Sequence, residues 1–490
     1  MLEFPHGFCC LKLAASLALI VAFVCGAVAQ ASPDSKVVKW SECDASYVSG
    51  ARCGTFRVPL DYGHSKSGTL ELFFVVLRAK EGPAAIDPIF YISGGPGQST
   101  SELAKAVPRF MQSVNSDRDV VLLDQRGTGK SYPLECASNV AGQTQLQYLL
   151  GDLFPVDWVK ACYSRLQVRP EFFTTAIAMQ DLHNLSAALG YKQFDLYGTS
   201  YGTRAVFSYL RQFPGDGVRT AVLKSPVPMN LVIAQDFAAD AQRSLDLLFT
   251  RCSADPKCND EFPSVKSEFR KILDNLDRES AKTKVLNPST SKPEQVALDR
   301  ALIATLVRSI LYRPQAAAKL PLMIHRAYLG DWGPFAEEAI AVRSDIERDA
   351  AGLYLSIVCS EDFPFIDQKQ VKSRSQETFL GVYWYLQLRQ GCRFWHVKSV
   401  KKSFRDLVSS SVPVLLITGS MDPTTPPPYT DATMKYLPHA LHVNFENGSH
   451  AFNSGDCELA IIKEFVEKGS GKEIDTSCAA RVDFPEFARN

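Results

Sequence analysis

The sequence predicts an α/β protein with a mostly parallel, doubly wound sheet and an inserted helical cap domain. Between residues 70 and 223, short apolar runs alternate with helical patterns, which favours parallel strands covered by helices on both faces. From about residue 231 to 398 the pattern is almost wholly helical. Strand patterns return between residues 414 and 445, so the C-terminal segment is expected to complete the first sheet.

Each strand of the sheet is expected at a short apolar run. These runs are residues 72–77, 89–92, 120–123, 194–197, 218–223, 414–418 and 441–445. Pro214 ends the helix after the fourth run, which leaves a short crossover to the fifth. The last helix, residues 458–468, is expected to end at Gly469, a residue type common at helix C-termini.

The change of pattern along the chain divides it into four parts. They are a signal peptide at 1–29, a first part of the sheet domain at 30–228, a helical cap at 229–400 and the completing part of the sheet domain at 401–490. The strongest helical patterns of the cap cover 238–251, 298–312 and 335–349. Residues 282–295, rich in Lys, Ser, Thr and Pro, are typical of an exposed loop.

The N-terminus has the pattern of an export signal. Lys12 precedes an apolar run at 13–24, and Ala27-Val28-Ala29 is an A-x-A cleavage pattern. A membrane anchor is the weaker alternative, because the run is shorter than the roughly 18 residues of a spanning helix. No later segment is long and apolar enough to cross a bilayer. We therefore expect an exported protein, periplasmic or secreted, without stable membrane insertion after cleavage.

Ten of the thirteen cysteines lie after residue 29, and an even count in an oxidising compartment indicates disulfides. Couples of neighbours along the chain predict five local bridges, although connectivity is not fixed by sequence. The couples are Cys43 with Cys53, Cys136 with Cys162, Cys252 with Cys258, Cys359 with Cys392, and Cys457 with Cys478. Zinc is the rival interpretation, but no couple has the C-x-x-C spacing with a matching couple or histidine pair. No metal site is expected.

The overall charge is balanced, with 53 basic and 53 acidic residues. Such a chain has no net field to recruit nucleic acid or an anionic membrane. Its hydrophobic content of 46% is ordinary for a globular protein. The composition favours a soluble enzyme and gives no indication of a nucleic-acid partner.

The pentapeptide Gly198-Thr199-Ser200-Tyr201-Gly202 lies between a strand-like and a helix-like run. A serine on such a tight turn has its hydroxyl clear of the backbone, and the glycines let strand and helix approach closely. The amide of Tyr201 then lies at a helix N-terminus, where it could stabilise an oxyanion. Ser200 is the predicted nucleophile. A chance Gly-x-Ser-x-Gly in a loop is the alternative.

A serine nucleophile needs a histidine base and a carboxylate that orients it. Asp422 follows the predicted strand at 414–418, and His450 follows the one at 441–445. Asp422 precedes Pro423 and could be a plain turn former, and a single histidine among eight could be a surface or core residue. The order Ser200, Asp422, His450 is nevertheless that of α/β-hydrolases.

A second oxyanion donor is expected from the loop that follows the strand at 89–92. Its sequence is Ser93-Gly94-Gly95-Pro96-Gly97. Glycine permits unusual backbone angles, so the amide of Gly95 could point into the site together with that of Tyr201. A simple Gly-Pro turn is the alternative.

Several motifs in order make the chain resemble the proline iminopeptidase and tripeptidyl aminopeptidase group of α/β-hydrolases. The motifs are Gly94 to Ser99, Asp124-Gln125-Arg126-Gly127-Thr128-Gly129-Lys130-Ser131, the Ser200 pentapeptide, Gly419 to Pro427 and Gly448-Ser449-His450. The resemblance implies an exopeptidase that takes peptides with a free N-terminus, with Ser200, Asp422 and His450 as triad and no cofactor. Ser93 stands where the iminopeptidase branch usually has histidine, so the secreted tripeptidyl branch is the nearer match.

An aminopeptidase must bind an ammonium group, and a carboxylate in the cap is the natural partner. Glu361 and Asp362 are the candidates, because a bridge from Cys359 would hold their segment still. Asp124 and Arg126 are expected to order loops. An esterase or lipase with the same triad remains an alternative, as does a non-catalytic binding module, although no triad member is missing.

Overall fold

The main sheet has nine strands in the computed structural model, which describes residues 38–64, 66–80, 87–136, 144–346, 350–452 and 455–489. The strands are β1 (Lys39–Ser41), β2 (Ala51–Pro59), β3 (Thr69–Leu77), β4 (Ile89–Ile92), β5 (Val120–Leu123), β6 (Phe194–Thr199), β7 (Val218–Lys224), β10 (Val414–Gly419) and β11 (Ala440–Phe445). Their order across the sheet is β1-β2-β3-β5-β4-β6-β7-β10-β11. Strands β1, β2, β3 and β5 pair antiparallel, and all pairs from β5 to β11 are parallel. The predicted mostly parallel sheet is confirmed.

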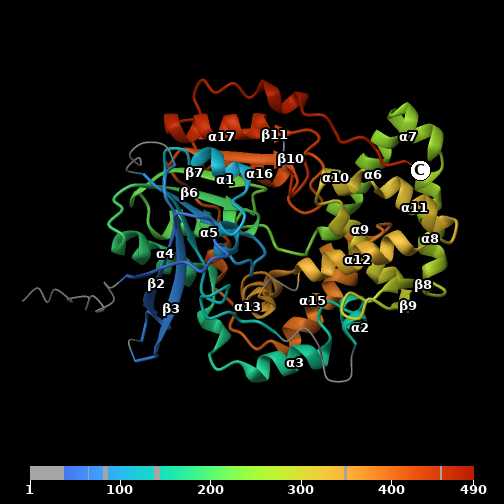
Figure 1. The fold of residues 1–490 in the computed structure, drawn as a ribbon, viewed down its shortest axis with the longest axis horizontal. Coiled ribbons are helices and arrows are strands. Elements are labelled where there is room, and N and C mark those ends of the chain that lie inside the picture. The colour runs from blue at the N-terminus through green and yellow to red at the C-terminus, as the bar shows by residue number, and fades with distance from the viewer. Residues whose placement is uncertain are drawn as a thin grey trace, which may run out of the picture. The chain divides into compact units, whose positions relative to one another are not determined.

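Helices cover the sheet on both faces (Figure 1). Side chains of α4 (Thr175–Ala188) and α5 (Tyr201–Gln212) share an apolar cluster with one set of strand residues. Those of α1 (Arg109–Val114) and α17 (Asp456–Lys468) pack with the alternate set. Because strand side chains alternate between faces, each central strand contributes to both clusters, which explains its unbroken apolar sequence.

The apolar runs located most of the strands. β4 and β5 coincide with the predicted runs at 89–92 and 120–123, and the other five overlap theirs. β1 and β2 at the antiparallel edge were not predicted. β2 alternates buried and exposed positions and includes Arg52, Gly54 and Arg57, so it lacks a continuous apolar run.

The segment between β7 and β10 is largely helical. It contains α6 (Phe237–Ala254), α7 (Pro256–Glu261), α8 (Val265–Leu276), α9 (Arg300–Ile310), α10 (Pro314–Ala317), α11 (Leu320–Tyr328), α12 (Gly333–Ile346), α13 (Ala351–Glu361), α14 (Gln368–Ser375) and α15 (Tyr383–Phe394). We call this segment the cap. Two earlier helices, α2 (Gln145–Leu149) and α3 (Val156–Arg165), share its apolar cluster. Helical packing in the cap therefore also uses residues that precede β7.

The predicted loop at 282–295 is wrong. The antiparallel strands β8 (Ala281–Leu286) and β9 (Pro293–Leu298) form a hairpin there. Val285, Val296 and Leu298 are buried in the cap cluster. The lysines of the hairpin, Lys282, Lys284 and Lys292, face solvent. The apolar positions are few and widely spaced, so composition concealed the strand period.

The structure joins the same five cysteine couples that the spacing predicted. The Cys359–Cys392 bridge links α13 to α15, and the Cys457–Cys478 bridge ties α17 to the C-terminal tail. The predicted signal at 1–29 and residues 347–349 of the third cap helix lie outside the described residues. Within those residues, none of the helices has both the length and the apolar character needed to cross a membrane.

Candidate active site

Ser200 lies on the tight turn between β6 and α5, as its pentapeptide predicts. Its backbone has φ of 52° and ψ of −124°, a strained conformation for a residue other than glycine. A Cβ at position 202 would lie 2.2 Å from the carbonyl oxygen of Ile92, so only glycine fits where α5 passes β4. The Ser200 amide donates to the Lys224 carbonyl at 2.9 Å, which fastens the turn to β7.

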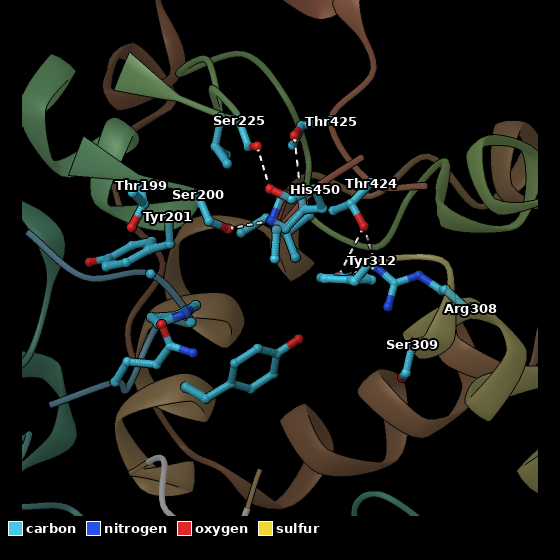
Figure 2. Close-up of a pocket in the computed structure, with 18 of the residues that line it drawn as sticks. Thr199, Ser200, Tyr201, Ser225, Arg308, Ser309, Tyr312, Thr424, Thr425 and His450 are labelled. Atoms are coloured by element: carbon cyan, nitrogen blue, oxygen red, sulfur yellow. Dashed lines mark hydrogen bonds between the residues drawn. The ribbon is translucent and has the colours of Figure 1, made fainter. Parts of the chain in front are cut away.

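His450 lies on the loop after β11, beside Ser200 (Figure 2), and its ring joins Ser200 to Asp422. Its Nε2 lies 2.9 Å from Ser200 Oγ, and its Nδ1 lies 2.8 Å from Asp422 Oδ2. The Ser225 hydroxyl donates to the His450 carbonyl at 2.7 Å and fixes the loop. The three residues that follow three different strands are thus brought into one hydrogen-bonded chain.

The Asp422 carboxylate is fully buried, and its own loop holds it in place. The amides of Thr424 and Thr425 donate to Oδ1 at 2.7 and 2.8 Å, and the Thr425 hydroxyl donates to Oδ2 at 2.7 Å. Burial alone would raise the pKa of Asp422, but His450 and these donors outweigh it and keep that pKa below its usual value. The carboxylate is therefore ionised and faces the imidazole.

Gly95 and Tyr201, the expected oxyanion donors, line the same cavity as Ser200. Neither the amide of Gly95 nor that of Tyr201 donates to a protein acceptor in the described part of the chain. Gly95 has φ of 102°, and a Cβ on Gly94 would lie 3.0 Å from Ser200 Cβ. The Gly-rich loop thus approaches the nucleophile closely because it has no side chains there.

Asp124 and Arg126 hold loops around the site but do not pair with each other. Asp124 accepts from the amide and hydroxyl of Ser101 and from the amide of Lys130, at 2.8 to 3.0 Å. Arg126 pairs with Asp181 at 2.6 Å and donates to backbone carbonyls. Asp124 therefore holds the segment that directly follows the Gly-rich loop, and Arg126 joins the end of β2 to α4.

A cavity of about 620 Å³ opens in front of Ser200, a size typical of sites that enclose a small ligand. Residues of the sheet domain line it beside Ser200, and the other lining residues include members of cap helices α6, α9, α12, α13 and α15 and of the earlier helices α2 and α3. Aromatic side chains make much of the lining, among them Phe237, Tyr354 and Trp384. The charged residues in the lining are Lys224, Arg308, Arg313 and Arg343, and no carboxylate of the described residues is among them.

The assignment of Glu361 and Asp362 to a substrate ammonium is corrected by this geometry. Both are fully buried and absent from the cavity lining. Glu361 accepts from the amide and hydroxyl of Thr175 at 2.8 and 2.7 Å. Asp362 pairs with Arg204 at 2.8 Å. These carboxylates bind the end of α13 to α4 and α5, so they join the cap to the sheet domain.

Sequence reasoning missed four side chains of the site. Thr424 and Thr425 order Asp422, and the pattern Asp-Pro-Thr-Thr could have indicated them, because Asp often accepts from amides two and three residues later. The Tyr312 ring packs edge-on against His450 with centroids 4.7 Å apart. Arg308 lies one turn before it. Nothing in the sequence separates these two from other residues of a helical segment.

Three comparisons relate the chain to known proteins. A profile of the alpha/beta hydrolase fold family matches residues 87–454. Serine protease Hip1 of Mycobacterium tuberculosis is 24% identical over 434 residues, which cover 79% of this chain and 80% of that protein. Tripeptidyl aminopeptidase of Streptomyces coelicolor is 28% identical over 222 residues, which cover 41% of this chain and 40% of the relative. The structure of proline iminopeptidase from Mycobacterium smegmatis aligns with 85% of this chain and 98% of its own, at 14% identity and a TM-score of 0.38.

Proposed function

Because this chain belongs to the alpha/beta hydrolase fold family, we propose that it is an exported serine peptidase with Ser200, His450 and Asp422 as its catalytic triad. One observation carries the proposal: Ser200 Oγ, His450 and Asp422 form a continuous hydrogen-bonded chain, and Ser200 and His450 line a cavity. The names of the relatives, a serine protease and a tripeptidyl aminopeptidase, favour peptides as the substrate class.

The proposed reaction is acyl transfer to Ser200. His450 Nε2 accepts the hydroxyl proton as Ser200 Oγ attacks the scissile carbonyl, and the ionised Asp422 stabilises the imidazolium. The amides of Gly95 and Tyr201 donate to the oxyanion that forms. His450 then gives its proton to the leaving amine, and a water molecule releases the acyl group by the reverse sequence.

We further propose that the substrates are short peptides cleaved near a free N-terminus. The cap covers the space in front of Ser200, and a cavity of about 620 Å³ holds a short peptide but not a folded chain. The name of the Streptomyces relative favours aminopeptidase action. Glu361 and Asp362, which the sequence suggested as partners of the ammonium, are not in the cavity lining, so the requirement for a free N-terminus rests on the relatives.

Export is proposed from two features of the chain. The signal pattern at 1–29 would direct it out of the cytoplasm. Five disulfides are typical of proteins that fold in an oxidising compartment. The cut after Ala29 can be read from the N-terminal sequence of the protein recovered from a periplasmic extract or the medium.

Hydrolysis of a peptide series tests the function. Unlabelled peptides of two to five residues, with free or acetylated N-termini, are incubated with the mature protein and with Ser200→Ala, and the products are identified by mass spectrometry. We expect cleavage that requires both Ser200 and a free amine. The mass of the released fragment gives the number of residues removed in each cut. If acetylated peptides are cleaved as well as free ones, the requirement for a free amine fails and a serine peptidase remains. If p-nitrophenyl esters are hydrolysed and no peptide is, the peptidase proposal fails and an esterase takes its place.

A further inference from the structure

Arg308 is a buried cation that borders the cavity, and only 2% of it is exposed. Its Nη2 donates to the Tyr312 hydroxyl and to the Thr424 hydroxyl, both at 2.9 Å (Figure 2). Its Nε and Nη1 donate to no acceptor in the described part of the protein, and Nε is fully buried. Nη1 is therefore the nitrogen that a ligand in the cavity can reach, and Nε is a buried donor without an acceptor.

The guanidinium is enclosed by aromatic rings instead of carboxylates. Its central carbon lies 3.9 Å from the centroid of the Phe237 ring and 4.6 Å from that of Trp384. Such contacts stabilise a cation only in part. No acidic side chain among the described residues forms an ion pair with Arg308.

Two other buried arginines show how this fold normally treats the same group. Arg126 is paired with Asp181 at 2.6 Å, and Arg204 with Asp362 at 2.8 Å. Neither lines the cavity. A buried charge without a partner is costly, so an unpaired one at a cavity wall indicates that a ligand supplies the counter-charge.

Arg308 is also close to the reacting groups. Its partner Tyr312 packs on His450 with ring centroids 4.7 Å apart, and its other partner Thr424 donates through its amide to Asp422. An anion held by Nη1 would thus lie in the same cavity as Ser200. The nearby Lys224 is already neutralised by Glu458 at 2.5 Å, which leaves Arg308 as the buried cation of the lining without an ion-pair partner in the described residues.

We propose that Arg308 binds a carboxylate of the substrate, so that the enzyme prefers acidic short peptides. The N–H groups of Nη1 can donate a charge-assisted hydrogen bond to a carboxylate, and the positive charge of the guanidinium balances it. The carboxylate could come from the C-terminus of the peptide or from an Asp or Glu side chain. This inference rests on the proposed peptidase function, and it adds the chemical class of the substrate.

The test compares matched peptides that differ in one carboxylate. One pair has a C-terminal acid or amide, and a second set has Glu or Gln at each position. We expect one source to raise kcat/KM by about 10- to 100-fold in the native enzyme, as is usual for a charge-assisted contact. Arg308→Gln should abolish this preference, so that kcat/KM becomes equal for the acid and the neutral peptide of each pair. Arg308→Lys, which keeps the charge without the fork, should retain part of it.

Arg300→Gln is the matched control. Arg300 lies on the same helix, two turns away, where it pairs with Asp277 outside the cavity. This variant should keep the full preference for the acid. A native enzyme that cleaves acid and amide alike would overturn the inference and leave the peptidase function intact. So would an Arg308→Gln enzyme that loses activity equally on both peptides.

A binding measurement covers the case in which no peptide is cleaved, which would end the peptidase proposal. Titration of Ser200→Ala with trialanine and with trialanine amide, followed by calorimetry, measures recognition without turnover. Glutamyl and glutaminyl tripeptide amides provide the second arm. Tighter binding of one acid, lost in Ser200→Ala with Arg308→Gln, supports the inference. Equal binding within both pairs contradicts it.

Discussion

The sheet domain and the cap place their functional residues by different means. Ser200, Asp422 and His450 each follow a strand end, in turns rich in Gly, Pro or Asp whose sequences indicate their position. In the cap, the sequence suggested Glu361 and Asp362 as partners of a substrate ammonium. In the structure they join α13 to the sheet domain instead. Arg308 lies in an ordinary helix and faces the cavity. The proposed catalytic residues are thus placed by local turns, whereas the proposed recognition residue is placed by the packing of helices.

The sheet domain and the cavity wall of the cap also differ in how their buried charges are neutralised. In the sheet domain and at its junction with the cap, carboxylates and arginines satisfy one another, as Arg204 does with Asp362. At the cavity wall of the cap, Arg308 has hydroxyl and aromatic neighbours. Substitutions at the first kind of position should therefore change stability, and those at the second kind should change substrate choice.

The largest effect is expected from Asp422→Asn. The asparagine keeps the size of the side chain but favours the wrong imidazole tautomer, so kcat should fall by about 10⁴-fold with an intact fold. The rate of hydrolysis of the best peptide and the thermal unfolding of the same sample measure the two effects.

Asp362→Asn changes a buried carboxylate that has a structural role, at the junction of the cap and the sheet domain. It removes one charge of the buried pair with Arg204, so it should lower the unfolding temperature and leave kcat of the folded enzyme nearly unchanged. If Asp362→Asn matched Asp422→Asn in lost kcat, the distinction between the two regions would be wrong.

A smaller effect is expected from Gly95→Ala, which moves an oxyanion donor. The φ of 102° disfavours a side chain, and the new Cβ would lie 2.8 Å from the Gly97 amide nitrogen. The loop must shift, and loss of one donor lowers kcat by about 10²- to 10³-fold. Steady-state kinetics should show the change in kcat more than in KM.

Gly50→Ala separates backbone strain from loss of the donor. Gly50 also has a positive φ, 82°, but its Cβ would meet no atom within 4 Å. This variant should lose some stability and keep its activity. Unchanged activity in Gly95→Ala would remove Gly95 from the proposed oxyanion hole.

The sequence could predict the central sheet and the triad because both depend on short-range patterns. Runs such as 89–92 are apolar on both faces. The glycines that the turn at Ser200 requires lie within two residues of it in the sequence. The β8–β9 hairpin was not predicted, because only one face of its two short strands is buried and the apolar pattern is weak. The positions of Tyr312 and Arg308 in the site could not be predicted from the sequence. They depend on contacts with Thr424 and His450, which lie more than a hundred positions away in the chain.

The smallest effect is expected from Glu361→Gln, and it depends on pH. Burial raises the pKa of Glu361 from 4.5 to about 7, more than Arg204 and Thr175 lower it. Between these values the folded protein holds a proton that the unfolded chain has released, so the free energy of unfolding falls as pH rises. Glutamine keeps the shape and lacks this titration. The variant should therefore gain roughly 2 to 3 kcal/mol relative to the native protein between pH 5 and pH 8. Urea unfolding at both pH values, with the exposed Glu337→Gln as control, measures the gain. An equal difference between Glu361→Gln and the native protein at pH 5 and pH 8 would show that Glu361 does not titrate in this window, and that its role at the junction of cap and sheet domain is independent of charge.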